Sequence, residues 1–205
     1  MTSPVYWSPL LYSFAMRMLY GRYFIGRYTA VADAIPSNVR VHETCAGDCF
    51  LYRRFLKNRP LMYMASDINP MFVSAGQGKG IHISRLDVRR DTLLDADYVL
   101  MLASLYQFIP EHKAVVDRLL ASARECVIIT EPVRNLATSA HPFVRFIGRC
   151  AVNPGTGPAP QRFDEKSMDD FIFEAYGGQV AKAALIAGGR EKMYVIRARG
   201  LAASL

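Results

Sequence analysis

The stretch VRVHETCAGDC, residues 39–49, runs from a short β-prone segment into a turn of small residues. Glu43 is the second-last residue of the segment, and the small residues 45–47 follow after Thr44. Small residues allow backbone amides to come close to a ligand. A second acidic residue, Asp67, ends the next apolar run 24 positions later, where a carboxylate can accept hydrogen bonds from both hydroxyls of a ribose. This pair predicts a binding site for a cofactor that contains a nucleoside.

Apolar runs and helical patterns alternate along the rest of the chain. Strands are predicted at 39–44, 61–66, 81–86, 98–103 and 126–130. Helices are predicted at 50–56 and from Pro70, which follows the N-cap Asn69. A third helix is predicted from Pro110, because Val116, Leu119, Leu120 and Ala123 form an apolar stripe. A fourth is predicted after the N-cap Asp164, where Phe163 and Met168 form a hydrophobic staple. Segments 180–186 and 192–199 flank residues 187–191 and predict a hairpin.

Repeated β-then-α units predict an α/β fold with a doubly wound, mostly parallel, seven-stranded sheet that ends in an antiparallel hairpin. We expect residues 1–205 to form one domain, with an N-terminal helical cap at 1–36, a core at 37–200 and a lid-like insert at 133–162. Such sheets bind ligands at the carboxyl ends of their strands, near the point where the strand order reverses. The residues that end each strand are therefore the candidates for function.

The composition is that of an ordinary globular protein, since 51% of the 205 residues are hydrophobic and 21% are charged. This excludes disorder, collagen and coiled coil. The four cysteines are too scattered for a disulfide scaffold or a Cys-x-x-Cys zinc site, so no metal and a reducing cytoplasm are predicted. No apolar run approaches the roughly 20 residues of a membrane span. The net charge of +7 fits either a solvated surface or an anionic partner.

Two cofactor classes use an acidic residue after a small-residue turn. A dinucleotide fingerprint requires three glycines, whose positions here hold Cys45, Gly47 and Phe50. A nicotinamide-dependent oxidoreductase is therefore a poorly supported alternative. The acidic-x-Gly-x-Gly-x-Gly turn of class I S-adenosylmethionine-dependent methyltransferases matches better, with Cys45 and Cys49 in place of its first and third glycines.

From about residue 39 to 199, the chain resembles that methyltransferase family in the order and spacing of its motifs. The matching segments are the turn at 43–49, ASDINP at 65–70, Asp87 before Val88, DYVLMLASLYQF at 97–108, VIITEP at 127–132 and the terminal hairpin. The resemblance implies a Rossmann-like methyltransferase fold. It also implies an enzyme of the EC 2.1.1 type that transfers a methyl group from S-adenosylmethionine to a small-molecule acceptor, either hydrophobic or anionic.

The resemblance also implies a cofactor site, made of Glu43, Thr44, Cys45, Ala46, Gly47, Asp67, Ile68, Asp87, Val88 and Ala103. Glu43 would orient the methionine amino group, Asp67 would hold the ribose and Asp87 would accept from the adenine amine. Ile68 and Val88 would pack on the adenine, while the backbone at Ala103 would lie near the sulfonium. We expect the thiol of Cys49 to crowd the cofactor. Taken singly, each carboxylate at a strand end also fits a helix cap or a solvated turn.

Methyl transfer is an in-line displacement, so alignment and desolvation matter most and no universal catalytic side chain is expected. A general base is needed only for an acceptor that must lose a proton. Candidates near the acceptor are Tyr106, Arg134 and His141, together with Glu131 at the end of the fifth strand. Packing is the alternative for Tyr106, a surface or loop position for His141 and a strand end for Glu131, so the sequence assigns no catalytic base.

The N-terminal extension is rich in aromatic residues and carries Arg17, Arg22 and Arg27. With the insert it can form an apolar, cationic lid or contact a membrane surface, and ordinary packing against the core is the alternative. Nucleic acid is disfavoured because Ala-Ser-Leu-Tyr at 103–106 replaces the Asn/Asp-Pro-Pro-aromatic turn of enzymes that methylate bases. The competing function is a non-catalytic partner or scaffold protein of this fold that has lost cofactor binding, with Cys49 as its first sign.

Overall fold

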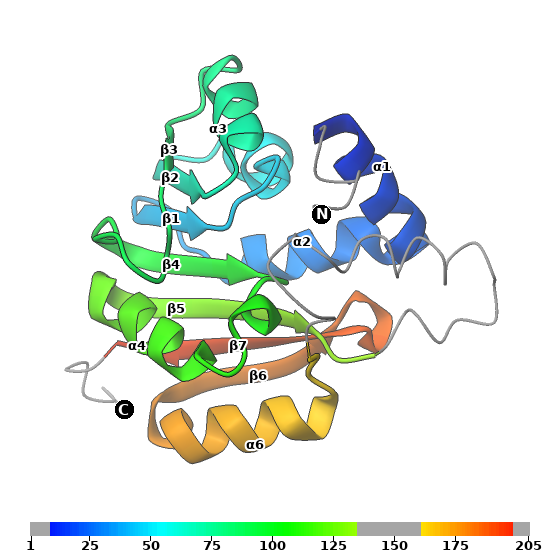
Figure 1. The fold of residues 1–205 in the computed structure, drawn as a ribbon, viewed down its shortest axis with the longest axis vertical. Helices are drawn as coiled ribbons and strands as arrows, with labels where there is room; N and C mark the ends of the chain where they lie inside the picture. Colours follow the sequence, from blue (N-terminus) through cyan, green and yellow to red (C-terminus); the bar gives the residue numbers. More distant parts are fainter. Residues whose placement is uncertain (1–8, 135–160, 199–205) are drawn as a thin grey trace.

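The computed structural model describes residues 9–134 and 161–198, which are built around a seven-stranded sheet (Figure 1). Its strand order is β3-β2-β1-β4-β5-β7-β6. The strands are β1 (Arg40–Thr44), β2 (Met62–Asp67), β3 (Ile83–Arg85), β4 (Ala96–Leu102), β5 (Ala123–Pro132), β6 (Val180–Ile186) and β7 (Glu191–Arg197). The first five pair in parallel, and β7 runs antiparallel to both β5 and β6. The predicted mostly parallel sheet with a terminal hairpin is confirmed.

Helices cover both faces of the sheet (Figure 1). They are α1 (Pro9–Tyr20), α2 (Phe24–Asp33), α3 (Pro70–Gln77), α4 (His112–Ser122) and α6 (Glu165–Tyr176), with short turns η2 (Gly21–Tyr23), η3 (Tyr52–Leu56), η4 (Leu105–Phe108), η6 (Gly177–Gln179) and η7 (Ala187–Gly189). Successive residues of β4 point into two different cores. Leu100 packs with α2, η3 and α3, whereas Met101 packs with α4 and α6. Burial on both faces explains why β4 lacks polar alternation.

Several predicted helix signals are confirmed in detail. Residues 50–56 are helical, although η3 takes the π form. The side chain of Asn69 accepts a hydrogen bond from the backbone N–H of Met71 at 2.9 Å and so caps α3. Asp164 and Ser167 form a capping box at the start of α6, while Phe163 and Met168 are both buried.

Two predicted boundaries are wrong, and one connection departs from the predicted β-then-α pattern. The sequence predicts that Ala123 belongs to the apolar stripe of a helix, but it is the first residue of β5. The helix α4 begins at His112 rather than at the predicted Pro110. Residues 86–95 contain no helix, so the connection from β3 to β4 is irregular. A local turn replaces that helix: the carbonyl of Asp87 accepts from the N–H groups of Arg90 and Asp91.

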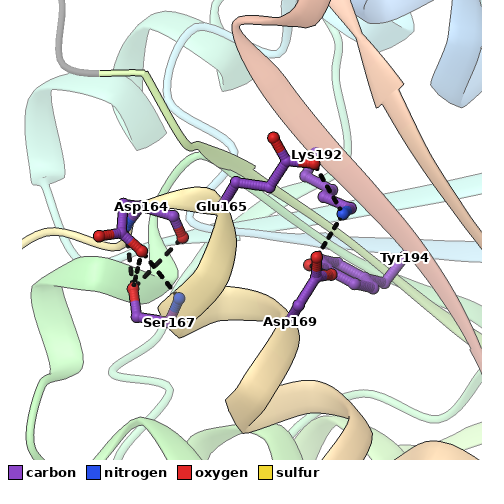
Figure 2. Close-up of polar contacts among 6 residues, drawn as sticks. All are labelled: Asp164, Glu165, Ser167, Asp169, Lys192 and Tyr194. Atoms are coloured by element: carbon purple, nitrogen blue, oxygen red, sulfur yellow. Dashed lines mark hydrogen bonds and ion pairs between the residues drawn. The ribbon is translucent and has the colours of Figure 1, made fainter.

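Ion pairs fasten α6 to β7 (Figure 2). The ammonium group of Lys192 lies 3.0 Å from a carboxylate oxygen of Glu165 and 2.5 Å from one of Asp169. The hydroxyl of Tyr194 donates to the other oxygen of Asp169 at 2.7 Å. Only 12% of the Lys192 side chain is exposed, so these contacts are partly shielded from water. The helix that follows the expected insert is thus fixed, while residues 135–160 of that insert lie outside the described residues.

A buried carboxylate joins the N-terminal cap to the start of β7. The guanidinium of Arg27 lies 2.9 Å from one oxygen of Glu191 and donates to the other at 3.2 Å. The hydroxyl of Tyr20 also donates to Glu191, which is fully buried. Next to this contact, a Cβ at Gly188 would lie only 2.4 Å from the ring of Tyr23. The cap and the terminal hairpin therefore fit closely against each other.

The turns that follow β1 and β4 use left-handed backbone. The φ angles are 52° at Cys45, 55° at Gly47, 53° at Cys49 and 50° at Ala103. A side chain in this region brings its Cβ too close to the following carbonyl oxygen, at a cost of roughly 1–2 kcal/mol. Three of these four residues carry a Cβ, so the backbone at the strand ends stores strain, as is common at functional sites.

Replacing Arg27 with Met is expected to lower the free energy of unfolding by about 3–5 kcal/mol, because it leaves the buried carboxylate of Glu191 without its cation. The matched control is Lys166→Met, which breaks a solvent-exposed ion pair with Asp170 and should change little. Urea denaturation of both variants measures the difference. Equal effects of the two substitutions would contradict the importance of the buried pair.

Cys45→Gly is expected to be more stable than Cys45→Ala by about 0.5–1 kcal/mol, because only glycine relieves the left-handed strain. Cys126, in the regular strand β5, provides the control, since glycine there should be less stable than alanine by about the same amount. Thermal denaturation of the four variants gives both orders. The same order at both positions would show that the turn at Cys45 is unstrained.

Candidate functional site

The order of the strands reverses between β1 and β4. The chain moves outward from β1 to β2 and β3, and then returns to place β4 on the other side of β1. Neighbouring parallel strands whose connections leave in opposite directions create a crevice at their carboxyl ends. Glu43, Asp67 and Ala103 end or follow three of these strands. The structure thus brings the main predicted site residues to one edge of the sheet.

Asp67 holds two backbone segments at this edge. One of its carboxylate oxygens accepts from the N–H of Gly47, and the other accepts from the N–H of Asn69, both at 2.8 Å. The residue is 8% exposed, and this burial raises the pKa of Asp67 although both N–H groups lower it. A carboxylate has about four lone-pair positions, so each oxygen can still accept one more hydrogen bond.

Glu43 lies behind the turn and is 3% exposed. The hydroxyl of Tyr63 donates to its carboxylate at 2.6 Å. Burial raises the pKa of Glu43 to about 8, more than this hydrogen bond lowers it. Cys49 is fully buried in the same core, so the thiol expected to crowd a cofactor has no exposed surface at the site.

Asp87 and the two apolar residues predicted to contact the adenine, Ile68 and Val88, differ in solvent exposure. The guanidinium of Arg89 binds both oxygens of Asp87 at 3.0 Å, and this hydrogen bonding lowers the pKa of Asp87. Ile68 is 50% exposed, whereas Val88 is only 3% exposed. Ile68 is therefore the predicted apolar residue with an open surface beside Asp67.

Other predicted site residues have structural contacts. The hydroxyl of Thr44 donates to the carbonyl of Leu100 at 2.8 Å and so links β1 to β4. The N–H of Ala46 donates to the carbonyl of Ser66, and the N–H of Ala103 donates to the carbonyl of Thr130. These contacts hold the strand ends in place, so any ligand contact from Ala46 or Ala103 comes from backbone or Cβ atoms.

The ends of β4 and β5 form the second part of the candidate site. Glu131 is fully buried and accepts from the N–H of Leu105, the first residue of η4. Burial raises the pKa of Glu131 to about 8. Tyr106 is also buried, and the guanidinium of Arg162 lies 4.3 Å from the centre of its ring. The two acceptor candidates from different segments, Glu131 and Tyr106, thus belong to one polar cluster.

The remaining acceptor candidates are Arg134, two residues after the end of β5, and His141. Arg134 has an exposed side chain, and its backbone N–H donates to the carbonyl of Arg190 at 3.3 Å. His141 falls outside the described residues. In residues 9–134 and 161–198 there is no cluster of three or more His, Cys, Asp or Glu side chains suited to a metal ion. In the same ranges no helix is long and apolar enough to cross a bilayer.

Three residues of the site were missed by sequence reasoning. Arg89 was detectable, because a basic residue two positions after Asp87 can pair with it within one turn. Tyr63 was hidden in an apolar run, since its contact with Glu43 depends on the pairing of β1 with β2. Arg162 reaches Tyr106 across 56 residues of sequence, and nothing local signals that contact.

No protein-family model matches the sequence, and neither does any curated protein. Solved structures do match. The magnesium protoporphyrin IX methyltransferase of Synechocystis PCC 6803, with bound S-adenosylhomocysteine, has a TM-score of 0.61 and 15% identity, with 90% of this chain and 93% of that chain covered. Another match is a chain from the Haloferax volcanii complex between the Trm112 methyltransferase activator and a proposed methyltransferase. Its TM-score is 0.69 at 10% identity, with 97% of this chain and 99% of that chain covered.

A third match is an S-adenosylmethionine-dependent methyltransferase from Thermotoga maritima, with a TM-score of 0.63 and 11% identity, covering 89% of this chain and 93% of that chain. At these identities the similarity concerns the fold. The chain therefore has the Rossmann-like fold of the class I S-adenosylmethionine-dependent methyltransferases.

Proposed function

We propose that the protein binds S-adenosylmethionine at the carboxyl ends of β1 to β4 and transfers its methyl group to a small-molecule acceptor. The observation that carries this proposal is the carboxylate of Asp67. It lies where the strand order reverses, next to a left-handed turn and the exposed side chain of Ile68. It can also accept further hydrogen bonds after binding the N–H groups of Gly47 and Asn69. A ribose with an adenine attached matches these features.

The residues at the site fit the cofactor. Asp67 would accept from the ribose hydroxyls, and Ile68 would pack on the adenine. Asp87 would accept from the adenine amine, because its pairing with Arg89 leaves lone pairs available. Glu43 would accept from the methionine amino group once the carboxyl has lost its proton, because the contact with Tyr63 leaves lone pairs available.

When bound, S-adenosylmethionine supplies a methyl group on a positively charged sulfur. The protein's part is to align the acceptor with that group and to exclude water. The backbone at Cys45 and Ala103 would line the cleft, because both residues begin the turns that border it. Glu131 holds the start of η4 in place through the N–H of Leu105, and so acts on the acceptor side as a positioning residue.

The acceptor class follows from the side chains near the ends of β4 and β5. Arg162 and Arg134 are exposed cations, and Arg162 lies on the ring of Tyr106. An aromatic ring next to one guanidinium group, with a second cation just after β5, favours a hydrophobic or anionic small molecule. A reducing cytoplasm stays the predicted compartment.

A non-catalytic partner protein is the second candidate function. It is favoured by the closed surroundings of Glu43, which is buried and already bonded to Tyr63. The Haloferax volcanii match also comes from a complex with an activator protein. Failure to bind S-adenosylmethionine or S-adenosylhomocysteine would favour this candidate over methyl transfer.

Asp67→Asn is expected to weaken the binding of S-adenosylhomocysteine by about 10- to 100-fold, because hydrogen bonds to a charged group are worth about 1.5–3 kcal/mol each. The control is Asp97→Asn, since Asp97 also accepts from a backbone N–H, that of Arg40, but at the amino end of β4. Calorimetric titration of both variants checks the result, with thermal denaturation to confirm folding. Equal affinities in the two variants would remove Asp67 from the cofactor site.

Cofactor affinity is also expected to rise with pH. With its pKa raised to about 8, Glu43 is protonated near pH 6 and must release a proton to accept from the charged amino group. Affinity for S-adenosylhomocysteine should then increase up to about tenfold per pH unit between about pH 6 and 7.5, while the ligand's amino group stays mostly charged. Glu43→Gln should abolish this slope. A wild-type affinity that does not change with pH would contradict the assignment of Glu43.

A further inference from the structure

The outer side of α1 exposes large apolar side chains. Phe14 is 59% exposed and Met18 is 42% exposed, and they lie one helical turn apart. Arg17, also exposed, belongs to the same side of the helix. Ala15 and Tyr20 are buried on the opposite side, against the protein. The helix thus keeps its inner side for packing and presents apolar and cationic groups outward.

Basic side chains of η3 extend this surface. The guanidinium groups of Arg17 and Arg53 each lie 5.8 Å from the centre of the Phe50 ring, so the two residues flank one aromatic side chain. Arg54 follows on η3 and is exposed. Arg53 also pairs with Asp48 at 2.6 Å, but only 5% of that acidic side chain is exposed. We call Phe14, Arg17, Met18, Arg53 and Arg54 the cap patch.

The charge of the cap patch restricts what can cover it. The first acidic residue of the chain is Asp33, so no carboxylate of residues 1–32 offsets Arg17, whereas Asp48 offsets Arg53. A second copy of the chain would bring the same cations against one another, which is unfavourable. Apolar side chains among basic ones on a helix match the interface of a bilayer with anionic headgroups, where each basic residue adds about 1 kcal/mol of attraction.

We infer that the cap patch docks the protein on the surface of an anionic phospholipid bilayer, with α1 lying along the interface. The contact is peripheral, and it does not depend on the proposed methyl transfer. The hydroxyl of Ser13, one turn before Arg17 on α1, donates to Asp48 at 2.5 Å, and Arg53 of the cap patch pairs with the same carboxylate oxygen, within the turn that follows β1. Through Arg53 and Asp48, the docked surface therefore borders the turn that leads into the candidate cofactor site.

Flotation of the purified full-length protein with lipid vesicles tests the inference. We expect it to bind phosphatidylcholine vesicles that contain about one third phosphatidylglycerol, to bind pure phosphatidylcholine weakly, and to be released by high salt. The double substitution Phe14→Ser, Met18→Ser should lower the partition coefficient at least about tenfold. Arg17→Gln should lower it about fivefold.

Matched controls come from exposed residues outside the cap patch. Phe173 on α6 is 48% exposed, and Arg124 on β5 is exposed as well, so Phe173→Ser and Arg124→Gln should leave partition unchanged. Circular dichroism confirms that each variant is folded. The inference is overturned if the wild-type protein ignores anionic vesicles, or if the patch variants bind as well as the controls. A dimer in light scattering that the Phe14→Ser, Met18→Ser variant converts to a monomer would assign the patch to self-association instead.

Discussion

The carboxylate of Asp67 joins the two backbone segments on which the candidate site depends. Through Gly47 it fixes the turn that leaves β1, and through Asn69 it fixes the residue that caps α3. β1 is a central strand with β2 and β4 on its two sides, so its outgoing chain must turn sharply at the sheet edge. One side chain therefore links the end of a strand, a strained turn and the start of a helix.

The same edge of the sheet concentrates buried carboxyl groups in a chain whose net charge is +7. Glu43 and Glu131 end or nearly end β1 and β5, and burial raises the pKa of each to about 8. Glu191 starts β7 at that edge, but there Arg27 compensates the charge. Burying a carboxyl group without a cation lowers stability unless something else is gained. The proposed cofactor carries a sulfonium and an ammonium group, and such cationic groups would favour the ionised form of Glu43.

Much of the fold could be predicted from the sequence because its signals are local. The cap at Asn69, the capping box at Asp164 and the unbroken apolar run of β4 each depend on neighbouring residues. The missing helix at 86–95 was not predictable from apolar runs, since the side chains of Asp87 and its neighbours form a turn there instead. Pairing between distant segments, such as Arg27 with Glu191, leaves no trace in a local pattern.

The candidate site divides in the same way. Its acidic residues could be placed from their positions after predicted strands, and the structure brings them to one edge. Their protonation could not be predicted, because burial and the contact of Tyr63 with Glu43 follow from how strands pair. The position of the Cys49 thiol was also inaccessible to sequence: a left-handed φ directs this side chain into the core rather than toward a ligand.

The link between Arg27 and Glu191 spans 164 positions of the chain, and this separation sets the order of events on the ribosome. The helices of the cap are synthesised first, yet the carboxylate that locks them arrives with the last hairpin. Until then the inner side of α2, with Phe24, Tyr28 and Val31, has no complete surface to pack against. Phe50 covers part of this face early, at 4.9 Å from the rings of Phe24 and Tyr28, but the cover is complete only when the last hairpin has left the ribosome.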